Sequence, residues 1–89
     1  MPYIVPERRF EAADAPATEG ELNFAITTLV DDYIRRHPAG LRYAVLNEVV
    51  GALECAKLEL YRRIVGPYED KAIAKNGDVY LCDKAEVQS

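Results

Sequence analysis

The sequence predicts an all-α protein: a small helical bundle of two main antiparallel helices, with a short N-terminal helix or strap and a short C-terminal helix or extended segment. Two observations predict this class. Apolar residues recur at three- and four-residue steps in two long stretches, which is the period of an amphipathic helix. Proline and glycine fall between and after these stretches, where they end helices.

The chain has 89 residues, which predicts a single domain. Short chains bury a small fraction of their surface, so we expect a homo-oligomer to complete the bundle. The expected parts are an N-terminal strap over 1–19, a helix over 20–37, a long helix over 41–65, a short helix over 67–75, and a turn, short extended segment and tail over 76–89.

The N-terminal part combines prolines with apolar side chains. Pro6 can begin a short helix, PERRFEAAD, because the missing N–H of proline costs nothing in the first turn. Tyr3, Ile4, Val5 and Phe10 need cover from other residues. Two arrangements supply it, a strap over the bundle or an arm that reaches a neighbouring subunit.

The helix expected over 20–37 begins with the spacing of a capping box, Thr18 followed by Glu21. Its apolar residues share one face: Leu22, Ala25, Ile26, Leu29, Val30 and Tyr33. Phe24 falls on the polar side, which makes it a candidate oligomer contact. His37 comes at the helix end, directly before Pro38.

The long helix over 41–65 has one continuous apolar stripe: Leu46, Val49, Val50, Leu53, Ala56, Leu60 and Ile64. Gly51 in its interior costs about 1 kcal/mol relative to alanine, which the close approach of another helix could offset. Gly66-Pro67 is expected to kink or stop the helix. Asn76-Gly77 indicates a tight turn, and DVYLC a brief extended segment.

Charge and cysteine content exclude several classes. Eleven basic against fifteen acidic residues give a net charge of −4, which disfavours general nucleic-acid binding. The two cysteines are too few for a secreted disulfide framework, and Cys55 is expected to be a partly buried thiol. No apolar run is long enough to span a bilayer and the N-terminus lacks a signal sequence, so a cytoplasmic protein that does not contact membranes is expected.

Lys57 is the residue that the helical pattern does not explain. At ~100° per residue it lies about 20° from Leu46, within the apolar arc. It either extends its ammonium to solvent and pairs with Glu54, or meets an anionic ligand in a groove between helices or subunits. The second interpretation gives this set of ligand-binding candidates: Lys57, Tyr61, Asn47, Glu54, Asn23, Arg62, Tyr68 and Lys71.

These residue types suit a nucleotide-like ligand, because cations pair with phosphate and tyrosine rings stack on bases. The residues from Lys57 to Lys75 form the most basic window of the chain, although a solvated helix face would look similar. Catalytic patterns are weaker. His37 has no sequence-adjacent nucleophile, and Asp31-Asp32 and Glu69-Asp70 each diverge by ~100° on a helix. No enzyme activity, metal site or cofactor is expected.

Three blocks, GELNFAIT, NEVVGALECAKLELYRR and PYEDKAIAKNGDVY, resemble a family of small uncharacterised proteins of tailed phages and prophages. The resemblance covers Gly20 to Tyr80. It implies a phage product that acts in the host cytoplasm, and it brings no assigned activity, cofactor or site residue.

The leading hypothesis is a non-enzymatic, homo-oligomeric binding protein that sequesters a nucleotide-like signalling molecule of host immunity. The alternative is a protein-binding inhibitor of a host factor, or a structural or assembly component of a phage.

Overall fold

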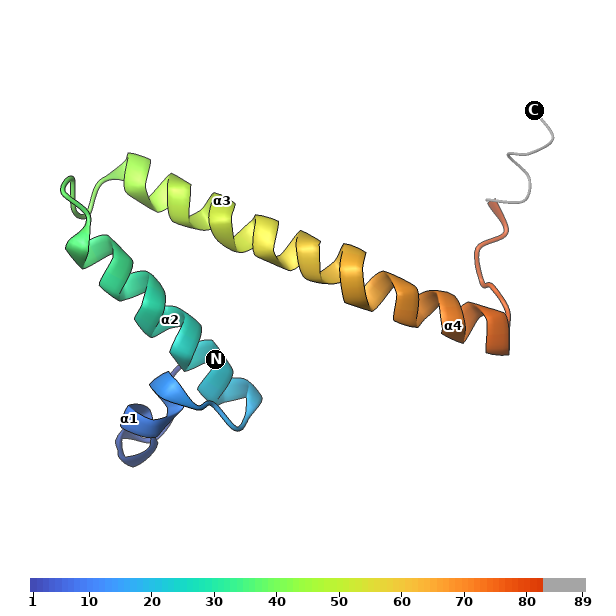
Figure 1. Cartoon of the computed structure of the whole chain (residues 1–89), viewed down its shortest axis with the longest axis horizontal. Helices are drawn as coiled ribbons and strands as arrows, with labels where there is room; N and C mark the ends of the chain where they lie inside the picture. The colour runs from blue at the N-terminus through green and yellow to red at the C-terminus, as the bar shows by residue number, and fades with distance from the viewer. Residues whose placement is uncertain (83–89) are drawn as a thin grey trace. The chain divides into compact units, whose positions relative to one another are not determined.

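The computed structural model describes residues 1–82, which are helical apart from turns and short irregular segments, and this confirms the predicted all-α class. The elements are α1 (Pro6–Asp14), α2 (Glu19–Arg36), α3 (Tyr43–Leu60), the π-helical turn η1 (Tyr61–Val65) and α4 (Gly66–Asn76) (Figure 1). The chain divides into two compact units, one over 1–51 and one from Ala52 onward. Most of the predicted tail lies outside the described residues.

In the first unit, α1 packs against α2. Pro6 stands in the first turn of α1, as expected, and Ala12 is completely buried in the contact. The chain before α1 lies against Gly20, where a Cβ would be in ordinary van der Waals contact with Ile4 Cγ2, at 3.4 Å. The predicted short N-terminal helix is therefore confirmed.

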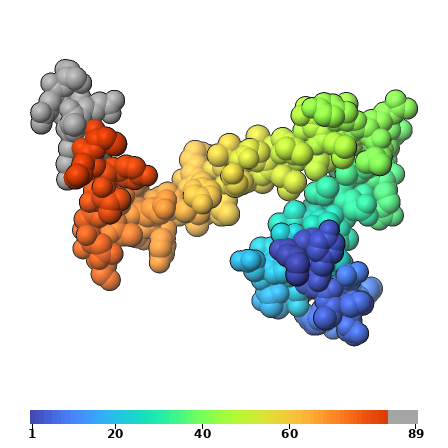
Figure 2. Space-filling model, turned by 180° about the vertical axis from the view of Figure 1, so that it is seen from behind, coloured from blue at the N-terminus to red at the C-terminus, as the bar shows by residue number. Residues whose placement is uncertain are grey.

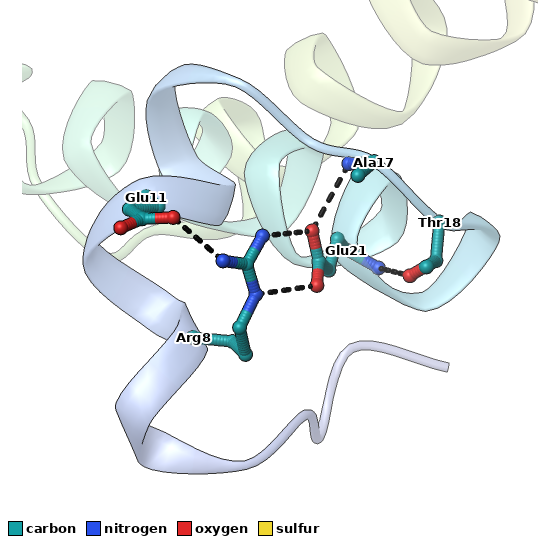
Figure 3. A network of polar contacts seen from close by, with 5 residues as sticks. All are labelled: Arg8, Glu11, Ala17, Thr18 and Glu21. Carbon is teal, nitrogen blue, oxygen red and sulfur yellow. Dashed lines mark hydrogen bonds and ion pairs between the residues drawn. The ribbon is translucent and has the colours of Figure 1, made fainter.

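A polar network joins the two helices (Figure 3). Arg8 of α1 donates from Nε and Nη2 to the two carboxylate oxygens of Glu21, both at 2.9 Å, and from Nη1 to Glu11 at 2.6 Å. Glu21 also accepts the Ala17 N–H at 3.0 Å. The Glu21 N–H donates to Thr18 Oγ1. This bond confirms the Thr18 side-chain half of the predicted capping box. The Glu21 carboxylate accepts hydrogen bonds from Arg8 and from the Ala17 N–H, and the sequence did not predict this arrangement.

The side of α2 that α1 covers differs from the predicted apolar face. Phe24 is half-buried, with the Arg9 guanidinium carbon 5.8 Å from its ring centre. Our expectation of an exposed Phe24 was therefore wrong, because α1 packs over that side. The exposed phenylalanine is Phe10, at 91%. Tyr3 and Val5 are also exposed, so the rest of the first unit does not supply the cover that we expected for these side chains.

The turn between α2 and α3 is held by side chains. His37 ends α2 as expected, and its Nδ1 accepts the Ala39 N–H at 3.0 Å. Tyr33 of α2 donates its hydroxyl to Glu48 of α3, and this bond, followed by burial, raises the pKa of the tyrosine. Val45, in the first turn of α3, is almost fully buried. The fully buried apolar core of the described residues thus consists of two small side chains, Ala12 and Val45.

The helix does not stop at Gly66-Pro67. The Gly66 N–H donates to the Tyr61 carbonyl, five residues earlier, and η1 forms this wider turn. The wider turn leaves room for the Pro67 ring and does not require a hydrogen bond from the N–H that proline lacks. Helix α4 therefore follows directly. A Cβ on Gly66 would lie 3.1 Å from that carbonyl oxygen, which favours glycine there. Gly77, with φ of 92°, ends α4 at the predicted turn, and the DVYLC segment that follows contains no strand in its described residues.

Candidate functional site

The eight predicted ligand-binding residues lie on four elements of the two units. Asn23 on α2 and Asn47 on α3 belong to the first unit. The others belong to the second unit: Glu54 and Lys57 on α3, Tyr61 and Arg62 on η1, and Tyr68 and Lys71 on α4. The contacts described below join neighbours on the same element or across one turn.

Lys57 has a partner on its own helix. Its Nζ lies 3.0 Å from a carboxylate oxygen of Glu54, one turn earlier, and both side chains are more than half exposed. An exposed pair of this spacing contributes about 0.2–0.5 kcal/mol to helix stability. The pair therefore holds the ammonium near the apolar stripe at little energetic cost, and it leaves the rest of the ammonium open to solvent.

Two other candidates also contact their own helix. Arg62 donates to both carboxylate oxygens of Glu59, at 3.0 and 3.1 Å. Asn23 accepts hydrogen bonds from the Thr27 hydroxyl at its backbone carbonyl, at 2.9 Å, and at its side-chain Oδ1, at 3.3 Å. These bonds join exposed neighbours along the chain, so they do not bring Arg62 or Asn23 together with other candidates.

Besides Glu54 and Lys57, the structure brings together the predicted residues Tyr68 and Lys71. They line a shallow hollow on α4 of about 290 Å³, with Ala72, Lys75 and Asn76. Tyr68, Lys71 and Lys75 follow at steps of three and four residues, so a ring and two ammonium groups share one helix face. The sequence prediction omitted Lys75 and Asn76, although the helical spacing from Lys71 to Lys75 was the available signal.

Large apolar side chains are exposed on α2 and α3. The predicted core face of α2 is exposed at four large side chains: Leu22, Ile26, Leu29 and Tyr33. On α3, every residue from Val50 to Leu60 is exposed. Figure 2 shows this second half of α3 in yellow. Within each unit taken by itself, the faces that we predicted to form a core are therefore exposed.

Within residues 1–82, no three histidine, cysteine or acidic side chains gather in a way that could hold a metal ion. Both cysteines are free and exposed, so the expected partial burial of Cys55 was wrong. None of the described helices combines the length and apolar character needed to cross a membrane.

A family model described as Domain of unknown function (DUF6899) matches residues 1–79. The chain belongs to the DUF6899 family. The match agrees with the expected membership of an uncharacterised family, and it includes the N-terminal residues that the three sequence blocks left out. Neither a search of curated proteins nor a search of solved structures returned a match.

Proposed function

We propose that this DUF6899 chain is a non-enzymatic binding protein that captures a partner protein through α2. The observation that carries this proposal is the exposed apolar row on α2, defined here as Leu22, Ile26, Leu29 and Tyr33. Leu29 alone is 70% exposed. The spacing of the row fits a helix that places its apolar side in a partner's groove, a common mode of peptide recognition.

The row has a length suited to such binding. From Leu22 to Tyr33 it covers eleven residue steps, about 16 Å at 1.5 Å per residue. The opposite side of α2 carries Asp31 and Arg35, which pair at 3.1 Å. A partner would therefore recognise one side of the helix and leave the other solvated. The resemblance to small phage proteins supports a host protein as this partner and the host cytoplasm as the place of action.

A second candidate function is sequestration of a nucleotide-like molecule. The hollow on α4 favours it, since Lys71 and Lys75 offer charge to a phosphate and Tyr68, which is largely exposed, offers a ring for stacking. This candidate ranks second because α4 alone lines the hollow, which includes two of the eight residues of the sequence hypothesis, Tyr68 and Lys71.

One capture experiment separates the candidates. The purified protein is incubated with extract of infected cells and washed, and the molecules retained are identified by mass spectrometry after denaturation. We expect a specific protein whose recovery falls at least tenfold with Leu29→Glu and is unchanged with Thr27→Glu, which adds the same charge on the polar side of α2.

A released nucleotide whose recovery is lost with Lys71→Ala would instead establish the second candidate. Equal capture by wild type and Leu29→Glu would contradict a partner site on α2. A chemically altered product that accumulates with time would contradict the non-enzymatic proposal.

A further inference from the structure

Helix α3 has an apolar row whose side chains are exposed. From Val50 to Leu60 all residues are exposed, around the whole circumference of the helix. A single helix of this length is marginal in water unless its apolar side packs against something. The question is therefore which surface covers α3.

The spacing of the apolar row indicates which surface covers α3. One series at seven-residue steps consists of Leu46, Leu53 and Leu60. A second series lies three residues before the members of the first and consists of Tyr43, Val50 and Lys57. Seven-residue repeats of apolar residues at two positions define the seam of a coiled coil. We call these six residues the α3 seam. Its five apolar members are between 39% and 82% exposed.

The residue types within the seam indicate the partner. Leucine occupies one position throughout, and β-branched valine occupies the other at Val50, a combination that favours two parallel helices. One lysine at the second position lowers stability and fixes register and the number of chains. Lys57 is that residue, and Glu54 beside it at 3.0 Å offsets its charge.

The area available suits a weak dimer. Burial of a leucine-sized side chain removes about 60–120 Å² from water, at 1.5–3 kcal/mol and 25 cal/mol per Å². Ten apolar seam side chains from two copies would then remove at most about 600–1,200 Å², at or below the lower limit for specific interfaces. We accordingly expect dissociation in the micromolar range.

We propose that the α3 seam pairs with the same seam of a second copy, as a short parallel two-stranded coiled coil with Lys57 as its register-setting residue. This inference deepens the self-association expected of the proposed binding protein. It goes beyond partner capture by α2, and its test needs no ligand.

Association is measured by analytical ultracentrifugation from about 1 to 500 μM, with four chains compared. Wild type should shift from the 10.0 kDa monomer to twice that mass. Leu53→Glu should weaken the dimer at least tenfold. Leu58→Glu should not, because Leu58 is a similarly exposed leucine of α3 outside the seam. Circular dichroism of diluted samples checks that each variant remains folded.

Leu29→Glu is the fourth chain, and it separates this inference from the proposed function. If Leu29→Glu weakens the dimer and Leu53→Glu does not, the interface lies on α2 and the α3 inference is wrong. A wild-type mass of 10.0 kDa over the whole range would also overturn it, even if partner capture by α2 holds.

Orientation is tested by disulfide cross-linking. In a background with Cys55→Ser and Cys82→Ser, Leu53→Cys places one thiol in each seam. Equivalent seam positions face each other in a parallel dimer, within the 4.4–6.8 Å Cα separation that a disulfide needs. We expect oxidation to join the chains through position 53 and not in the Leu58→Cys control. Equal cross-linking of both variants, or of neither, would contradict the parallel seam.

Discussion

Glu21 has more polar contacts than its place near the start of α2 suggests. Its carboxylate accepts two bonds from Arg8 and one from the Ala17 N–H, and these interactions lower its pKa from 4.5 to about 2. The largest cause is the bond from Arg8, followed by the bond from Ala17. The same bonds raise the pKa of Arg8 further above its usual range. The first unit therefore depends on an ionised Glu21.

This network predicts a pH dependence. Because the folded-state pKa of Glu21 lies below the ordinary value, its contribution to stability is present above pH 4.5 and is lost as the pH falls towards 2. Glu21→Gln should lower the melting temperature at pH 7, and the difference from wild type should shrink steadily below pH 4.5. Thermal melts followed by circular dichroism test this. A difference that stays constant down to pH 2 would show that the carboxylate charge does not stabilise the fold.

Single residues also show how far sequence reasoning reaches. The bond from the Glu21 N–H to Thr18 was predictable because a capping box is local in sequence. The bond between Arg8 and Glu21 was not, because it joins residues thirteen apart whose helices had no predicted relative placement. For the same reason Phe24 was assigned to solvent, although α1 lies over it.

At the scale of elements, the helices themselves were predictable and their packing was not. The expected helices over 20–37 and 67–75 correspond to α2 and α4 within one or two residues. We expected a kink or a stop at Gly66-Pro67, and the structure has the π-helical turn η1 directly before Gly66, which proline rules based on α-helical hydrogen bonds do not describe. Periodicity identified the apolar faces of α2 and α3, yet it could not say whether the same chain or another covers them.

Gly51 provides a test of α3 as an element. A Cβ at this position would meet no atom within 4 Å, so the close helix approach that could explain this glycine is absent among the described residues. Gly51→Ala should therefore stabilise α3 by about 1 kcal/mol, raise its helicity at 222 nm, and leave dimerisation intact, because Gly51 is outside the seam.

The matched control is Gly77→Ala. Gly77 has a φ of 92°, which alanine adopts only with strain, so that variant should lose stability. A loss of stability with Gly51→Ala would reveal a neighbour at Gly51 that the described structure does not contain.

At the scale of the whole molecule, the small buried core contrasts with large exposed apolar faces. Two fully buried apolar residues, Ala12 and Val45, stabilise little on their own. The exposed rows on α2 and α3 are the surfaces that we propose for association with a protein partner and with a second copy. The proposed seam would give Lys57 a structural role, beside the two interpretations that the sequence left open, a pair with Glu54 and a ligand contact.

The most direct test of this account is the self-association of Lys57→Ile, measured by analytical ultracentrifugation beside wild type. A β-branched apolar residue at this seam position should tighten association at least tenfold and permit species larger than the dimer, because the residue that fixes the number of chains is gone. Lys57→Ile that associates no more strongly than wild type would contradict a seam that contains Lys57. So would a Lys57→Ile chain that stays at the 10.0 kDa of a single copy.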